Sequence, residues 1–150
     1  QAVFEAASDL GIKLAVKPHP GEKLETNYTK DLAEKHGFTF VPASACNTQQ
    51  IMLAAHSVTA GRSTCLTEAC LLDKNTGGII PDLGEEWVNP FPPMSLGAIP
   101  YTQDWEGINE VVSLVASSDK EVNKTLADYR KSFSVDGKAS KRLADLVESL

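Results

Sequence analysis

Helical and extended hydrophobic patterns alternate along this chain, and short turns separate them. Extended patterns cover residues 12–16, 38–41, 57–60, 76–81 and 97–102. Helical patterns cover residues 1–10, 24–36, 48–56 and 64–72, and three further helices close the chain after residue 107. This alternation predicts an α/β fold with a parallel sheet. Because crossovers are right-handed, we expect a Rossmann-like, doubly wound sheet with helices on both faces and the C-terminal helices packing back on the sheet.

The length fits one domain. A chain of 150 residues with 42% hydrophobic residues can bury about two-thirds of its unfolded surface, which excludes a disordered protein. No apolar run reaches the ~18 residues typical of a membrane span. The net charge of −6 argues against nucleic-acid binding, which depends on clustered Lys and Arg. A local anion site stays open, because backbone N–H groups can hold a phosphate on an acidic protein.

The three cysteines have no metal-binding or redox spacing. Cys46, Cys65 and Cys70 form neither a CxxC pair nor a zinc motif, so we interpret them as buried, reduced thiols of a cytoplasmic protein without disulfides or metal. The first residues lack the basic start and apolar core of a signal peptide. The chain opens inside a helical pattern without an initiating Met, and we therefore expect a piece of a longer protein.

The first candidate site is the turn that follows the first strand, Lys17-Pro18-His19-Pro20-Gly21. Prolines on both sides of His19 fix the backbone, so the imidazole has little conformational freedom left to lose on binding. Lys17 and His19 together can donate hydrogen bonds to a phosphate or a carboxylate. The alternative is a rigid turn whose histidine faces solvent.

The second candidate site is the turn Gly61-Arg62-Ser63-Thr64, which opens a helix. Gly61 permits a sharp turn or a close approach to a ligand. Ser63 or Thr64 is expected to cap the helix, whose first N–H groups would then form an anion cradle. Glu68, one turn into the helix, lies either on the surface or against a ribose hydroxyl. An ordinary helix cap is the alternative.

A proline-rich stretch follows the fourth strand. Five of the eight prolines lie in the stretch from Pro81 to Pro100 inclusive, which predicts a long, semi-rigid loop. Trp87 and Phe91 in this loop either stack on a ligand or pin the loop to the core. Asp82 either contacts a sugar or caps a turn. The sequence contains no P-loop, GxGxxG, zinc or GxSxG motif.

With both turns in place, the sequence resembles the C-terminal, donor-binding half of GT-B-type glycosyltransferases. The matching segments are VKPHPGE, LAAHSVTAGRSTCLTEACLL and VDGKASKRLADLVESL, and the resemblance covers nearly all of the chain. The most similar groups are capsule and polysialic-acid-type transferases and the CDP-glycerol glycerophosphotransferases. UDP-N-acetylglucosamine 2-epimerases are more distantly similar.

The resemblance implies a site for a nucleotide-activated donor. His19 and Pro20 match the HP motif, and Ser63 and Thr64 match the Ser/Thr motif, both of which contact the donor phosphates in those families. Glu68 matches a residue that approaches the ribose. Lys17, Gly61 and Arg62 have no counterpart in these motifs, but they lie in the same two turns and complete the phosphate-binding set that we expect. His19 would stabilise the leaving phosphate. The resemblance implies no metal and no cofactor beyond the substrate, a nucleotide-activated sugar or CDP-polyol.

The same resemblance implies what lies outside the sequence. The acceptor, a glycan or polyol, would bind an N-terminal half that is missing here, and the first strand of the C-terminal half is missing too. The parent protein would be an enzyme of polysaccharide biosynthesis, with work at a membrane surface and homodimerisation left open, whereas this fragment alone is expected to be inactive. A non-catalytic α/β module that binds an anion or a partner, and a 2-epimerase-like enzyme, are the alternatives. A missing strand also predicts that the sheet closes directly or borrows a strand through dimerisation.

Overall fold

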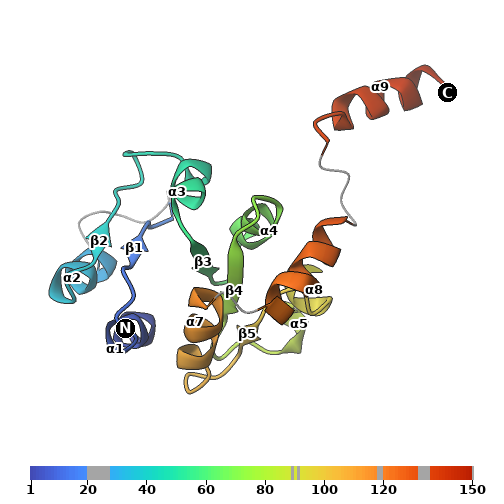
Figure 1. Cartoon of the computed structure of the whole chain (residues 1–150). Coiled ribbons are helices and arrows are strands. Elements are labelled where there is room, and N and C mark those ends of the chain that lie inside the picture. The colour runs from blue at the N-terminus through green and yellow to red at the C-terminus, as the bar shows by residue number, and fades with distance from the viewer. Residues whose placement is uncertain (20–27, 89, 91, 118–119, 132–135, 150) are drawn as a thin grey trace.

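The computed structural model describes residues 1–19, 28–88, 90, 92–117, 120–131 and 136–149 of the chain (Figure 1). The strands are β1 (Ala15–Val16), β2 (Thr39–Phe40), β3 (Ser57–Ala60), β4 (Asn75–Ile79) and β5 (Tyr101–Thr102). The helices are α1 (Ala2–Asp9), α2 (Tyr28–Lys35), α3 (Thr48–Ala54), α4 (Thr64–Leu71), α5 (Glu85–Val88), α6 (Pro92–Ser95), α7 (Ile108–Ala116), α8 (Lys120–Lys131) and α9 (Ala139–Glu148).

The strands form two small parallel sheets. β1 pairs with β2, and β3, β4 and β5 form a second sheet in that order. The α/β class and the parallel pairing are confirmed. Within the described part of the chain no strand pairing joins β1 to β3, so the sheet is divided between them. Figure 1 shows the strands in the order β2, β1, β3, β4, β5 across the molecule.

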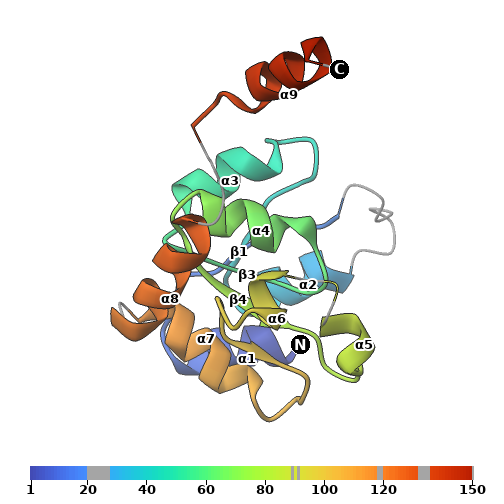
Figure 2. The same ribbon diagram turned by 90° about the vertical axis from the view of Figure 1, so that its right-hand side faces the viewer.

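Helices cover both faces of the three-stranded sheet. Two consecutive glycines in β4 let a helix approach each face closely. A Cβ on Gly77 would lie 2.8 Å from the Cγ1 atoms of Val111 and Val115 on α7. A Cβ on Gly78 would instead lie 2.8 Å from Sδ of Met94 on α6. Successive residues of a strand point to opposite faces, so α7 lies on one face and α6 on the other. Figures 1 and 2 both show α4 and α7 on either side of β4.

Helix α1 connects the two sheets through packing. Phe4 is buried with Leu32 and Ala33 in a cluster that also includes partly buried side chains of β1 and β2. Ala6, less than one turn later, is buried with Ile108 and Val112 of α7, and Ile79 of β4 packs on the same cluster. One short helix therefore contributes to the cores of both sheets, and this packing holds them together where hydrogen bonds do not.

Two predictions for the second half of the chain are wrong. The stretch from Pro81 to Pro100 is not one continuous loop, because it contains α5 and α6, and Met94 of α6 belongs to the main core. The C-terminal helices do not all pack back on the sheet. Leu126 and Tyr129 of α8 are buried in the main core, but α9 has no buried residue.

Helix α9 extends away from the rest of the molecule (Figures 1 and 2). Its apolar side chains Leu143, Leu146 and Val147 are 62%, 58% and 62% exposed. Their helical spacing correctly predicted a helix, but spacing alone does not specify what a helix packs against.

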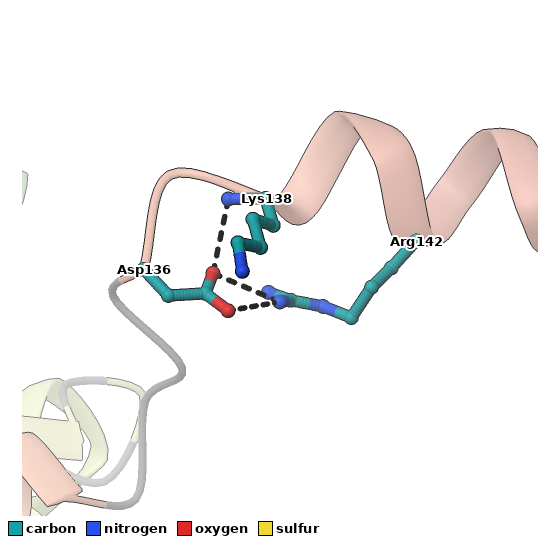
Figure 3. Close-up of polar contacts among 3 residues, drawn as sticks. All are labelled: Asp136, Lys138 and Arg142. Atoms are coloured by element: carbon teal, nitrogen blue, oxygen red, sulfur yellow. Dashed lines mark hydrogen bonds and ion pairs between the residues drawn. The ribbon is translucent and has the colours of Figure 1, made fainter.

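An ion pair fixes the start of α9 (Figure 3). The Arg142 Nη1 atom donates to both carboxylate oxygens of Asp136, at 2.9 and 2.8 Å, and the Lys138 N–H donates to Oδ1 at 3.0 Å. The Arg142 contact, assisted by the Lys138 N–H, holds the pKa of Asp136 below its ordinary value. These contacts replace the side-chain cap that α9 lacks.

Candidate functional site

The turn after β1 exposes His19 and anchors its neighbours. Pro18 is buried and His19 is exposed, so the backbone is held by the protein while the imidazole faces outward. The Lys17 Nζ atom donates a hydrogen bond of 2.9 Å to the Ala43 carbonyl oxygen in the loop after β2. Lys17 therefore links the carboxyl ends of the two paired strands. Pro20 lies outside the described residues.

The turn after β3 is a capped helix start. Ser63 is the N-cap of α4, with an extended backbone, and its Oγ accepts a hydrogen bond of 3.2 Å from the Cys65 N–H. Ser63 rather than Thr64 thus caps the helix. Gly61, Arg62 and Thr64 are exposed around this cap. The first-turn amides of α4 lie at the positive end of its dipole, where an anion is stabilised.

Glu68 lies one turn further along α4 and is half-buried. Its Oε2 accepts a hydrogen bond of 2.7 Å from Nε2 of Gln49 on α3. The carboxylate therefore has a hydrogen-bond partner on α3, the exposed Gln49 side chain. No motif or spacing in the sequence links Gln49 to Glu68, so this contact could not be predicted.

Helix α3, which carries Gln49, is itself fixed at both ends. At its start Asn47 and Gln50 form a capping box, with hydrogen bonds of 2.8 and 2.9 Å between each side chain and the other residue's N–H. At its end the Lys74 ammonium donates to the Leu53 and Ala55 carbonyl oxygens at 2.9 and 2.8 Å. These contacts restrain the helix that positions Gln49 beside Glu68.

The two candidate turns belong to elements that end on one side of the molecule. In Figure 2 the carboxyl end of β1 and the beginnings of α4 and α5 lie on the right-hand side. Arg62, Ser63, Thr64 and Glu68 lie within one short segment, the turn after β3 and the first half of α4. In open α/β sheets, ligands bind at this carboxyl edge of the strands.

The carboxyl ends of β4 and β5 carry a further polar contact. Asp82 follows β4 with φ of 62°, a left-handed conformation that is uncommon outside glycine. Its Oδ2 accepts a hydrogen bond of 2.8 Å from Nε1 of Trp105, whose side chain is 54% exposed. Asp82 thus holds an exposed indole at the same edge, a pairing that the sequence did not predict. The Trp87 side chain and Phe91 lie outside the described residues.

The cysteines are free thiols, but only Cys70 is fully buried. The prediction of burial is therefore wrong for Cys46 and Cys65, which are partly exposed. Burial raises the pKa of Cys70 to about 11. Among the described residues no group of three or more His, Cys, Asp or Glu side chains could hold a metal ion. In the same part of the chain no helix is long and apolar enough to cross a membrane.

Comparison with protein-family models, with curated proteins and with solved structures gives no match to this chain.

Proposed function

We propose that this chain is the donor-binding domain of a glycosyltransferase-like enzyme, with a Rossmann-like, doubly wound architecture. The donor is a nucleotide-activated sugar or CDP-polyol, and the acceptor is a glycan or a polyol. The observation that carries the proposal is the start of α4. There a parallel strand leads to the exposed Arg62 and a capped helix N-terminus, and one helical turn later to the carboxylate of Glu68, which accepts a hydrogen bond from Gln49.

Each part of this helix start suits one part of the donor. The first-turn amides and Arg62 provide hydrogen bonds and positive charge for the phosphates. Glu68 accepts hydrogen bonds, as a ribose with two adjacent hydroxyls requires, and the bond from Gln49 leaves further lone pairs on the carboxylate for a sugar. An acidic protein can bind a nucleotide in this way because the donors are local and oriented.

His19 provides the second contact to the phosphates in this proposal. It is exposed on a turn that Pro18 anchors, at the end of a parallel strand. In the transfer, a hydroxyl of the acceptor forms a new bond to the sugar or polyol phosphate while the bond to the nucleotide breaks, and negative charge builds on the leaving phosphate. An imidazole N–H and helix amides directed at that oxygen would stabilise this charge.

Thermal unfolding with added ligands tests the proposal. UDP and CDP at about 100 times their dissociation constants should stabilise the fold by about 2.7 kcal/mol. Inorganic phosphate at equal concentration should stabilise it much less, because it lacks the ribose and base. Arg62→Ala should weaken the nucleotide effect, whereas Lys141→Ala on the exposed helix α9 serves as a matched control for loss of a positive charge.

Two results would contradict the proposal. If no nucleoside diphosphate stabilises the fold, the chain does not bind a nucleotide-activated donor. Equal stabilisation by phosphate and by nucleotides leaves a simple anion-binding module, which has no need for Glu68.

A further inference from the structure

The division between β1 and β3 lies in the middle of the strand order. β1 pairs with β2 on one of its two sides, and β3 pairs with β4 on one of its two sides. In the described part of the chain no strand pairing joins β1 and β3. All residues of β3 are half-buried, whereas the three middle residues of β4 are buried. In an α/β sheet covered on both faces, a central strand is expected to be buried like β4. β3 therefore has the exposure of an edge strand in a central place.

The backbone of β1 is oriented toward this division. The Thr39 and Val41 N–H groups donate to the carbonyl oxygens of Leu14 and Val16, at 3.0 and 2.8 Å. The backbone groups of successive strand residues point to opposite sides. Since Leu14 and Val16 bond to β2, the N–H and C=O of Ala15 point away from β2 and toward β3.

The backbone of β3 is also oriented toward this division. The Gly78 N–H donates to the Pro100 carbonyl oxygen just before β5 at 2.9 Å, and the Ile80 N–H donates to the Thr102 carbonyl oxygen at 3.0 Å. Since the backbone groups of successive residues alternate in direction, those of Gly77 point to the side of β3. Gly77 lies opposite Thr59 in the parallel register. In a parallel pair, the backbone groups of such a residue bond to the residues before and after the one opposite, here Val58 and Ala60, and not to Thr59 itself. The N–H and C=O of Thr59 therefore point toward β1.

Helix α1 indicates which direction a strand between β1 and β3 would run. α1 packs under both sheets and leads directly into β1. Figure 2 shows the start of α1 on the right-hand side, where β1 ends. A strand that ends there and continues through α1 into β1 makes the right-handed crossover that parallel strands require.

We propose that the position between β1 and β3 accepts one extended apolar strand of about four or five residues, parallel to both neighbours and joined to the start of α1. The strand joins the two sheets into one, in the order β2-β1-strand-β3-β4-β5. It is apolar because helices cover both faces of such a sheet. This inference concerns the fold and holds whether or not a nucleotide binds.

The test adds such a strand before Gln1. One form of the protein carries five β-branched apolar residues followed by a short turn, and its control carries an extension of equal length made of Ser and Gly. Amide hydrogen exchange is measured by NMR without nucleotide. The apolar extension should slow exchange at Ala15 and at Thr59 by tenfold or more relative to the control, and should raise the Tm.

A proline variant adds a second measure. Thr59→Pro removes an N–H that points away from β4, so the control form should tolerate it as an edge position. In the form with the apolar extension, the same change should remove protection at Ala15 and most of the gain in Tm. Equal exchange in both extended forms overturns the proposal. So does protection at these amides that rises with protein concentration in the control, because a second copy of the chain would then occupy the position.

Discussion

The Gln49 side chain donates a hydrogen bond of 2.7 Å from Nε2 to Oε2 of Glu68, and this contact joins α3 to α4 one turn beyond the capped start of α4. Helix α4, whose capped N-terminus is the candidate phosphate site, is thereby linked to its neighbour α3. The contact orients Glu68 for a second hydrogen bond, to a ribose in the proposed function.

Glu68→Gln should therefore weaken binding of CDP or UDP about tenfold, because one charge-assisted hydrogen bond is worth roughly 1.5–3 kcal/mol. The matched ligands are the 2′,3′-dideoxy forms of the same nucleotides, which lack both hydroxyls. Titration calorimetry should give equal affinities of wild type and variant for these. A comparable loss for both kinds of ligand would mean that Glu68 acts on α4 and not on ribose.

His19→Ala should weaken nucleotide binding about tenfold or more, since it removes a donor to the phosphates. Ser63→Ala should do less, because the backbone amides of α4 remain. His56→Ala is the matched control, as His56 is also exposed and follows α3. If His19→Ala and His56→Ala bind nucleotide equally well in calorimetry, His19 does not belong to the site.

Much of the helix start could be predicted from sequence because its determinants are local. Gly61, Ser63 and the helical spacing after Thr64 lie within a few residues of one another, and the structure has β3 and α4 within one residue of the predicted bounds. The strand predicted over residues 12–16 is shorter in the structure, since only Ala15 and Val16 are paired. Whether a residue counts as strand depends on a partner elsewhere in the chain, which a local pattern does not contain.

The features that could not be predicted from the sequence are contacts between residues far apart in the chain. Gln49 reaches Glu68 across 19 positions, and Trp105 reaches Asp82 across 23. The exposure of α9 has the same origin, because an amphipathic pattern predicts an apolar face but not its partner. The division of the sheet likewise follows from which strands meet in space.

Gly77→Ala should destabilise the fold by about 1–3 kcal/mol, because the added methyl meets two valines of α7 and overpacks the core. Gly78→Ala is the matched variant. Its methyl meets the flexible Met94 side chain most closely, and we expect a smaller loss because methionine can change rotamer. Urea unfolding measures both. An equal or larger loss for Gly78→Ala would contradict the close approach of α7.

Cys70 should make stability depend on pH in the alkaline range. Its pKa is about 11 in the fold against 9.0 for a free thiol, so the unfolded chain releases the proton first. The stabilisation is complete below pH 9 and is lost as the pH rises toward 11, by up to ~3 kcal/mol. Urea unfolding across this range should show a steeper fall for wild type than for Cys70→Ala. Parallel curves would mean that the thiol does not contribute.

The most direct test of the central claim is a nucleotide titration followed by NMR of the backbone amides. With CDP or UDP, the donor-binding account predicts saturable shifts concentrated at residues 61–65 and at His19, with a smaller response at Glu68. Inorganic phosphate should move the amides of residues 61–65 and of His19 but not that of Glu68, because it lacks a ribose. Saturable shifts confined to other surfaces, or none at the start of α4, would contradict the account.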